Sequence, residues 1–140
     1  MGTYSICKNG RLYVWEAEGL WHLSKDLPTK TVPLSSISNF DDVCWFHASR
    51  EKPTCRVVAA HAKRIYEADL SRPIVLSASG IMMDGMHRVA KAWILGMKEI
   101  QAVQFLEDPP ADQILPLPEK KKRHNTSLNL TRGADAPLAG

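Results

Sequence analysis

The chain has 140 residues, of which 44% are hydrophobic and 24% charged, and its formal net charge is +3. This length supports one compact core but not two ordinary domains. No apolar run approaches the roughly 20 residues of a membrane-spanning helix. The composition therefore excludes a membrane span, a collagen-like fibre and a disulfide scaffold, and the charge is too weak to require a nucleic acid as partner.

The three cysteines, Cys7, Cys44 and Cys55, form no C-x-x-C pair and leave an odd count. Free thiols in the cytoplasm are the natural interpretation. A signal peptide is not expected, because the charge of Lys8 precedes any apolar segment. No histidine or carboxylate stands at ligand spacing beside the cysteines, so we expect packing or surface thiols and no metal site.

The first half of the chain predicts strands followed by a long loop. Three strands are expected, at 11–15, 20–23 and 31–34. We interpret residues 1–30 as a small β meander, and Pro33 places the third strand near a sheet edge. Residues 38–53 lack regular periodicity, which predicts a loop with one helical turn at most. This loop holds two adjacent carboxylates, Asp41 and Asp42, beside the aromatic Trp45.

The second half predicts alternating helices and strands. A helix is expected from Thr54, a residue suited to an N-cap, to about Asp69. Its apolar stripe contains Val58, Ala62, Ile65 and, on the same stripe, His61. Two strands at 74–76 and 81–83, a helix from Met86 to about Leu95 and a strand at 101–105 complete the predicted core. The apolar stripe of that last helix is Val89, Ala90, Trp93, Ile94 and Met97, and Gly96 suits its C-terminal end.

The composition changes at Glu107. Five of the nine prolines lie beyond this residue, and apolar periodicity stops. We therefore divide the chain into a domain, 1–106, and an extended or disordered tail, 107–140, of which at most residues 114–117 pack on the core. The basic run 120–123 is typical of a solvated segment, with nucleic-acid binding as the weaker alternative.

The segment 81–88, Ile-Met-Met-Asp-Gly-Met-His-Arg, has the strongest chemical signal. A strand that stops at Asp84-Gly85 and turns directly into a helix aims the first backbone N–H groups and the positive end of the helix dipole at an anion. Gly85 would let a ligand approach the backbone closely. His87 and Arg88 fall in the first helical turn, where the planar guanidinium of Arg88 suits phosphate. Asp84 can cap the helix, hold Arg88 or help to hold a metal ion carried by a nucleotide.

Purely structural roles are open for the same residues. Asp84 can be an N-cap alone, worth roughly 1 kcal/mol, and His87 and Arg88 can be surface residues. The place of His61 on an apolar stripe is more typical of a satisfied core histidine than of a catalytic one. Trp93 is expected in the core.

Residues 73–105 resemble the core of the ParB/sulfiredoxin superfamily. The shared prototype is a strand pair, a Gly-x-[His/Arg]-Arg turn, a helix ending in Leu-Gly and a final strand, and the turn here is Gly85-Met86-His87-Arg88. Residues 32–37 are similar to the strand and turn that open such domains, so the resemblance covers about residues 31–106. It implies an α+β fold with a single small mixed sheet and packed helices.

The branches of this superfamily imply different activities. Sulfiredoxins have a nucleophilic cysteine where this chain has Met86, and a thioether is no thiolate nucleophile, so sulfiredoxin activity is not expected. ParB proteins have Gly-Glu-Arg-Arg, bind CTP and continue into a helix-turn-helix domain, for which this sequence stops too soon. Free serine kinases carry Asp-Gly-His-His-Arg, from which this chain differs only at Met86, and they use an upstream carboxylate as a base.

The resemblance therefore implies a phosphate site whose residues are Asp84, Gly85, Met86, His87 and Arg88. Its implied ligands are ATP, ADP or CTP with Mg²⁺ and a small-molecule substrate. The expected function is nucleotide binding, with phosphotransfer of the free serine kinase type as its catalytic extension. In that extension the catalytic residues are His87 and, as the base, Asp41 or Asp42. The alternative is a non-catalytic nucleotide-sensing or DNA-associated module.

Overall fold

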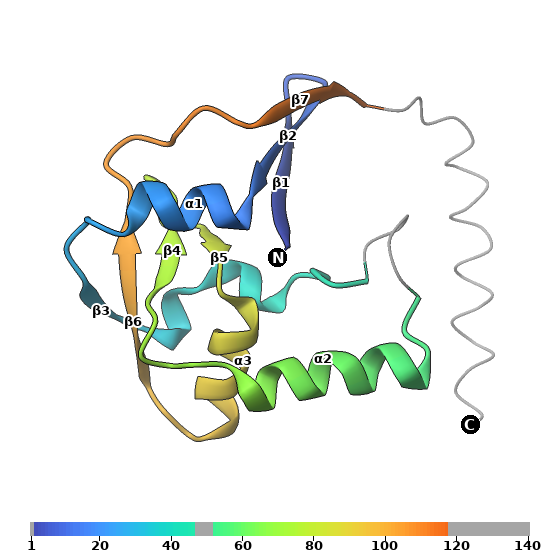
Figure 1. Cartoon of the computed structure of the whole chain (residues 1–140), viewed down its shortest axis with the longest axis vertical. Coiled ribbons are helices and arrows are strands. Elements are labelled where there is room, and N and C mark those ends of the chain that lie inside the picture. Colours follow the sequence, from blue (N-terminus) through green and yellow to red (C-terminus); the bar gives the residue numbers. More distant parts are fainter. Residues whose placement is uncertain (1, 47–51, 118–140) are drawn as a thin grey trace.

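The strand-forming segments of this chain build two sheets rather than the single sheet expected, within the α+β architecture that was expected. The computed structural model describes residues 2–46 and 52–117. An antiparallel sheet has the order β1 (Thr3–Lys8), β2 (Arg11–Glu16) and β7 (Gln113–Pro116). A mixed sheet has the order β3 (Lys30–Pro33), β6 (Glu99–Gln104), β4 (Ile74–Leu76) and β5 (Met82–Asp84). Figure 1 shows the first sheet extending away from the second.

The helices are α1 (Ala17–Ser24), α2 (Cys55–Glu67) and α3 (Met86–Ile94), with two short 3₁₀ turns, η1 (Leu34–Ser36) and η2 (Ser38–Asp41), between β3 and the loop that follows. The strand expected at 20–23 is wrong, because these residues lie inside α1. The buried residues of this segment have helical spacing: they are Ala17, Leu20 and Ser24. The expected N-terminal meander is therefore a hairpin followed by a helix.

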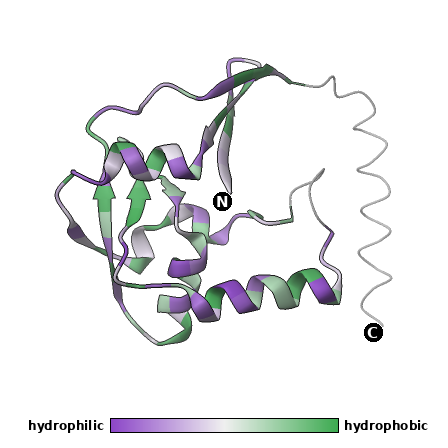
Figure 2. Ribbon diagram, viewed as in Figure 1, coloured by the Kyte–Doolittle hydropathy of each residue, from purple (hydrophilic) through white to green (hydrophobic). Residues whose placement is uncertain are grey.

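The mixed sheet is the centre of the core, and both of its faces are covered. Along β4, Ile74 and Leu76 join the cluster that contains Val89 of α3, whereas Val75 joins the cluster that contains Leu20 of α1. This alternation follows from the two-residue period of a strand. The hydropathy colouring in Figure 2 shows β4 in green, as expected for a strand that is buried on both faces. The helix α3 is thus fixed against the sheet, which positions its N-terminus.

The N-cap of α2 is the residue expected, but the buried face of this helix is not the apolar stripe expected. The hydroxyl of Thr54 accepts a hydrogen bond of 3.2 Å from the backbone N–H of Val57, as an N-cap does. Val58 is 48% exposed and Ala62 is also exposed, whereas His61 is buried. The face of α2 that packs on the domain is therefore rotated from the one expected.

The helix α3 ends as expected but does not bury all of its predicted stripe. Gly96 has a φ of +77°, and the N–H of Met97 donates to the carbonyl of Ala92, which closes the helix. Trp93 is 64% exposed, so its expected place in the core is wrong. The 3₁₀ turn η2 packs beside α3 and supplies a tilted ring contact from Phe40, 6.4 Å from the Trp93 ring centre. Helical spacing predicts which side chains share a face of the helix, but not whether another element covers that face.

Within residues 107–117, part of the segment expected to be extended or disordered is a paired strand. Residues 113–116 form β7, which pairs with β2 in the antiparallel sheet. The indole N–H of Trp15 donates to the carbonyl of Pro109, and the carboxylate of Asp112 accepts from the N–H of Glu16. The folded part therefore runs at least to residue 116. The basic run 120–123 lies outside the described residues. Within the described ranges, no helix has both the length and the apolar character needed to span a membrane.

Candidate functional site

Gly85 joins β5 to α3 and is the N-cap residue of the helix. Its φ is +119°, a conformation that residues with a side chain rarely adopt. A Cβ at this position would lie 2.6 Å from Cγ2 of Ile74 on the neighbouring strand β4. The sequence suggested that this glycine makes room for a ligand. The structure shows that it makes room for β4.

The first turn of α3 leaves two backbone donors without a helical acceptor. The N–H groups of Arg88 and Val89 both donate to the carbonyl of Gly85, at 2.9 Å. The N–H groups of Met86 and His87 come before the first such bond, and helix geometry provides them with no acceptor. Asp84 is not the N-cap residue, because Gly85 occupies that position and the Asp84 carboxylate is paired with Arg88. The helix start therefore has the donors and the dipole that favour an anion.

Arg88, the residue expected to hold phosphate, is largely buried and paired with other groups of the chain. Its side chain is 12% exposed and forms an ion pair of 3.0 Å with Asp84. It also donates to the carbonyl of Pro73 at 2.7 Å and to that of Arg72 at 3.3 Å. Burial lowers the pKa of the guanidinium, and the carboxylate of Asp84 opposes this shift. Arg88 therefore ties α3 to the entry of β4 and to the end of β5.

His87 lies against α2 rather than in open solvent. Its Nε2 is 2.9 Å from Nδ1 of His61, and the guanidinium of Arg64 is 3.3 Å from the same Nδ1. The pKa of His87 is lowered to about 4, first by burial and then by electrostatic interaction with His61, Arg64 and Arg88. His87 is therefore a neutral imidazole near pH 7.

Trp45 covers the two histidines, a contact that the sequence analysis missed. Its ring centre is 4.6 Å from that of His61 and 4.5 Å from that of His87, with interplanar angles of 14° and 9°. Phe46 meets His61 edge-on at 5.4 Å. The available signals were an aromatic pair in an irregular loop and a histidine on an apolar stripe. Neither signal says that the loop folds back onto α2 and α3.

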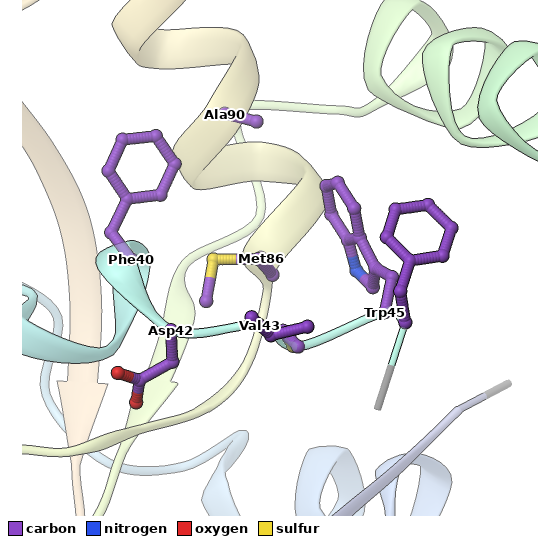
Figure 3. A pocket seen from close by; sticks show the side chains of 8 residues that line it. Phe40, Asp42, Val43, Trp45, Met86 and Ala90 are labelled. Atoms are coloured by element: carbon purple, nitrogen blue, oxygen red, sulfur yellow. The ribbon is translucent and has the colours of Figure 1, made fainter. Parts of the chain in front are cut away.

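A cavity of about 310 Å³ opens beside the first turn of α3. It is lined by Phe40, Asp42, Val43, Cys44, Trp45, Phe46, Met86 and Ala90. Met86 and Ala90 are one helical turn apart on α3, and the aromatic rings come from the segment that precedes residue 47. Figure 3 shows the Met86 side chain between Phe40 and Trp45. The cavity is therefore mostly apolar and aromatic.

The two candidate catalytic aspartates lie differently with respect to this cavity. Asp42 lines its edge, but its carboxylate points away from Met86 and Trp45 (Figure 3). Asp41 ends η2, is exposed and is not a lining residue. The structure therefore brings neither carboxylate together with His87.

The site residues do not fit a protein-held Mg²⁺. Asp84 is the acidic residue of the motif, and its carboxylate is paired with Arg88. Among residues 2–46 and 52–117, no group of three or more His, Cys, Asp or Glu side chains could hold a metal ion. All three cysteines are exposed.

No family model, curated protein or solved structure matches this chain. The resemblance of residues 73–105 to the ParB/sulfiredoxin superfamily therefore remains a prediction based on the motif and on the order of its elements.

Proposed function

We propose that this chain is a nucleotide-binding protein whose phosphate site is the start of α3. The observation that carries the proposal is the position of Met86. Its backbone N–H is one of the two donors without a helical acceptor, and its side chain lines the aromatic cavity. A ligand that reaches both features has an anionic group at one end and a flat ring at the other. A nucleotide has this chemistry.

The charges around the helix start favour an anion. Arg64 and Arg88 lie close enough to lower the pKa of His87. Arg88 is already paired with Asp84, whereas Arg64 is exposed and can approach a bound phosphate. Together with the helix dipole, this arrangement supports binding of a negatively charged group.

The cavity suits the ring of the ligand. Pockets for small molecules are mostly apolar and aromatic, with a few polar groups that fix orientation. Phe40, Trp45 and Phe46 supply aromatic faces and edges here, and Met86 supplies a polarizable thioether. We limit the proposal to binding, because the carboxylate of Asp42 points away from the residues that the ligand would touch.

Calorimetric titration at fixed salt tests the proposal, with ATP, CTP, inorganic tripolyphosphate and adenosine as ligands. We expect tripolyphosphate to bind through the helix start and a nucleotide to bind about tenfold more tightly, a difference of roughly 1.4 kcal/mol. Absence of binding by all of the phosphorylated ligands would reject the proposal. Equal affinity for tripolyphosphate and both nucleotides would reject the role of the cavity.

A charge reversal with a matched control locates the site. Arg64→Glu places a negative charge beside His61 and should weaken tripolyphosphate binding about tenfold at low salt. Lys63→Glu makes the same change of net charge at the adjacent exposed position of α2. Equal losses in the two variants would show that only the overall charge of the protein matters.

A further inference from the structure

Three side chains form a hydrogen-bonded row from the surface of α2 to the start of α3. The guanidinium Nη1 of Arg64 is 3.3 Å from Nδ1 of His61, and the same Nδ1 is 2.9 Å from Nε2 of His87. His61 is 7% exposed, so the middle of the row is buried. The order of donors and acceptors in this row determines which nitrogen of His87 is available to a ligand.

Arg64 determines which groups in this row donate hydrogen bonds and which accept them. A guanidinium has N–H donors and no acceptor. If Arg64 donates to Nδ1 of His61, that nitrogen has a lone pair and carries no proton. The hydrogen in the bond between the two histidines then belongs to Nε2 of His87. His87 is therefore the Nε2–H tautomer, and its Nδ1 is the unprotonated nitrogen.

The packing of Trp45 holds this arrangement in place. The indole lies over both imidazoles, which are themselves within 15° of coplanarity. A tilt of the His87 ring would break the stacking on Trp45, and a flip of the ring would break the hydrogen bond to His61. In histidine, Nδ1 is also the ring nitrogen nearer the backbone, and here that backbone is the first turn of α3.

We propose that His61 is a positioning residue that fixes His87 as the Nε2–H tautomer, so that Nδ1 of His87 takes up a proton from solvent when an anion binds at the start of α3. The binding half of this inference rests on the proposed function. No covalent bond forms or breaks. The resulting imidazolium keeps its Nε2–H on His61 and directs its new Nδ1–H toward the anion.

The charges that face His87 explain why the proton is absent before binding and present afterwards. His61 and Arg64 face it from α2 and Arg88 from its own helix, while Asp84 of β5 is paired with Arg88. The loop contributes the uncharged ring of Trp45. Burial, His61 and the cations Arg64 and Arg88 keep the pKa of His87 at about 4. A bound anion opposes the cations and stabilises the imidazolium, so the pKa of His87 rises on binding.

The linkage has a definite sign. Because the bound state holds more protons than the free state, affinity for an anion increases as the pH falls toward the free pKa of His87. The increase is at most about tenfold for each pH unit, which corresponds to uptake of one proton. A site with a permanently neutral or permanently charged His87 would show no such dependence.

Nitrogen-15 NMR of the histidine side chains, on the full chain, tests both halves. We expect the free protein at pH 7 to show Nε2–H on His87 and an unprotonated Nδ1. Sulfate is the ligand for the second half, because it does not titrate in this pH range. We expect its addition at pH 6 to protonate Nδ1 of His87, and calorimetry in two buffers of different ionisation enthalpy to show net proton uptake.

Substitutions of His61 separate positioning from simple packing. His61→Leu removes the acceptor and should give a mixture of His87 tautomers. His61→Asn places an amide oxygen near the position of Nδ1 and should restore the Nε2–H form. His22→Gln, an exposed histidine on α1, is the matched control and should change neither the tautomer nor the proton uptake.

The outcomes distinguish the two proposals. An Nδ1–H tautomer of His87 in the free protein would overturn the role of His61 whether or not anions bind. Sulfate binding without proton uptake would overturn the inference and leave the proposed function intact. Failure of sulfate, tripolyphosphate and nucleotides to bind would overturn the proposed function and the proton uptake together, while the tautomer measurement would still decide the role of His61.

Discussion

The first turn of α3 buries a charged residue, whereas the last turn exposes large apolar residues. At the start, Arg88 is a charged residue whose side chain is 12% exposed, held by Asp84 and by two backbone carbonyls. At the end, Trp93 and Ile94 are large apolar residues that are 64% and 62% exposed. The two turns belong to one helix of nine residues.

The difference lies in what surrounds each turn. The start of α3 sits where β4, β5 and α2 meet, so a charge there can be both buried and paired. At the end, Trp93 contacts the ring of Phe40 on η2 yet remains largely exposed. We conclude that the specific contacts of α3 are concentrated at its first turn, where the candidate site lies. Three substitutions and one pH dependence test this contrast between the two turns.

The largest loss of stability is expected from Gly85→Ala, which changes the junction between β5 and the first turn of α3. The new Cβ meets Ile74 at 2.6 Å in a backbone conformation with φ of +119°. Strain and overpacking together should cost about 4 kcal/mol of unfolding free energy. Gly96→Ala at the other end has a similar positive φ but open space around it, so it should cost only about 1 kcal/mol. Urea denaturation measures both, and equal losses would contradict the contrast between the two ends.

Arg88→Ala should be the next most damaging change. It leaves Asp84 without its partner and two carbonyls without their donor, for a loss of about 3 kcal/mol. Arg56→Ala, on the exposed surface of α2, is the matched control and should change the unfolding free energy by less than about 0.5 kcal/mol. The double variant Arg88→Ala with Asp84→Ala should recover part of the loss. An unfolding free energy of Arg88→Ala equal to that of the wild type would contradict the structural role of Arg88.

The pH dependence of stability should contain a contribution from His87. Its folded-state pKa of about 4 lies below the ordinary value, so the folded protein favours the neutral ring. The unfolded chain takes up a proton as the pH falls through about 6.5, and the folded protein does so only near 4. The contribution of His87 to the unfolding free energy is therefore fully present above pH 6.5. It falls by roughly 1–2 kcal/mol toward pH 4, allowing for solvent screening of a partly exposed ring. The difference in unfolding free energy between wild type and His87→Phe should change by this amount over this range, and a constant difference would contradict the shift.

The smallest effect is expected from Trp93→Ser at the exposed end. The side chain is 64% exposed and meets Phe40 by a tilted ring contact. Its loss should cost less than about 1 kcal/mol. Thermal unfolding is a sufficient measurement. A loss comparable to that of Arg88→Ala would show that the last turn is packed as tightly as the first.

Local signals in the sequence predicted the bounds of many elements. Thr54 as an N-cap and Gly96 at a C-terminal end gave the limits of α2 and α3 closely, because capping depends on a few neighbouring residues. The strand predicted at 20–23 failed because a run of four residues cannot distinguish a period of two from a helical period. Including Ala17 and Ser24 shows the helix.

The site was only partly predictable, because its contacts join distant parts of the chain. The motif correctly placed the start of α3 after β5 at Gly85. The burial of Arg88 depends on the carbonyls of residues 72 and 73, and the covering of His87 depends on Trp45, more than 40 residues away. Residue type and spacing do not encode such contacts. They are set by how the loop and α2 pack against α3.

We propose above all that the backbone of the first turn of α3 binds phosphate. Amide NMR during a titration with ATP tests this claim residue by residue. We predict that the N–H signals of Met86 and His87 shift most at saturation, followed by the indole signal of Trp45, while those of Trp93 and Ile94 at the other end stay in place. Saturable binding with the largest shifts elsewhere, and unchanged signals for Met86 and His87, would contradict it.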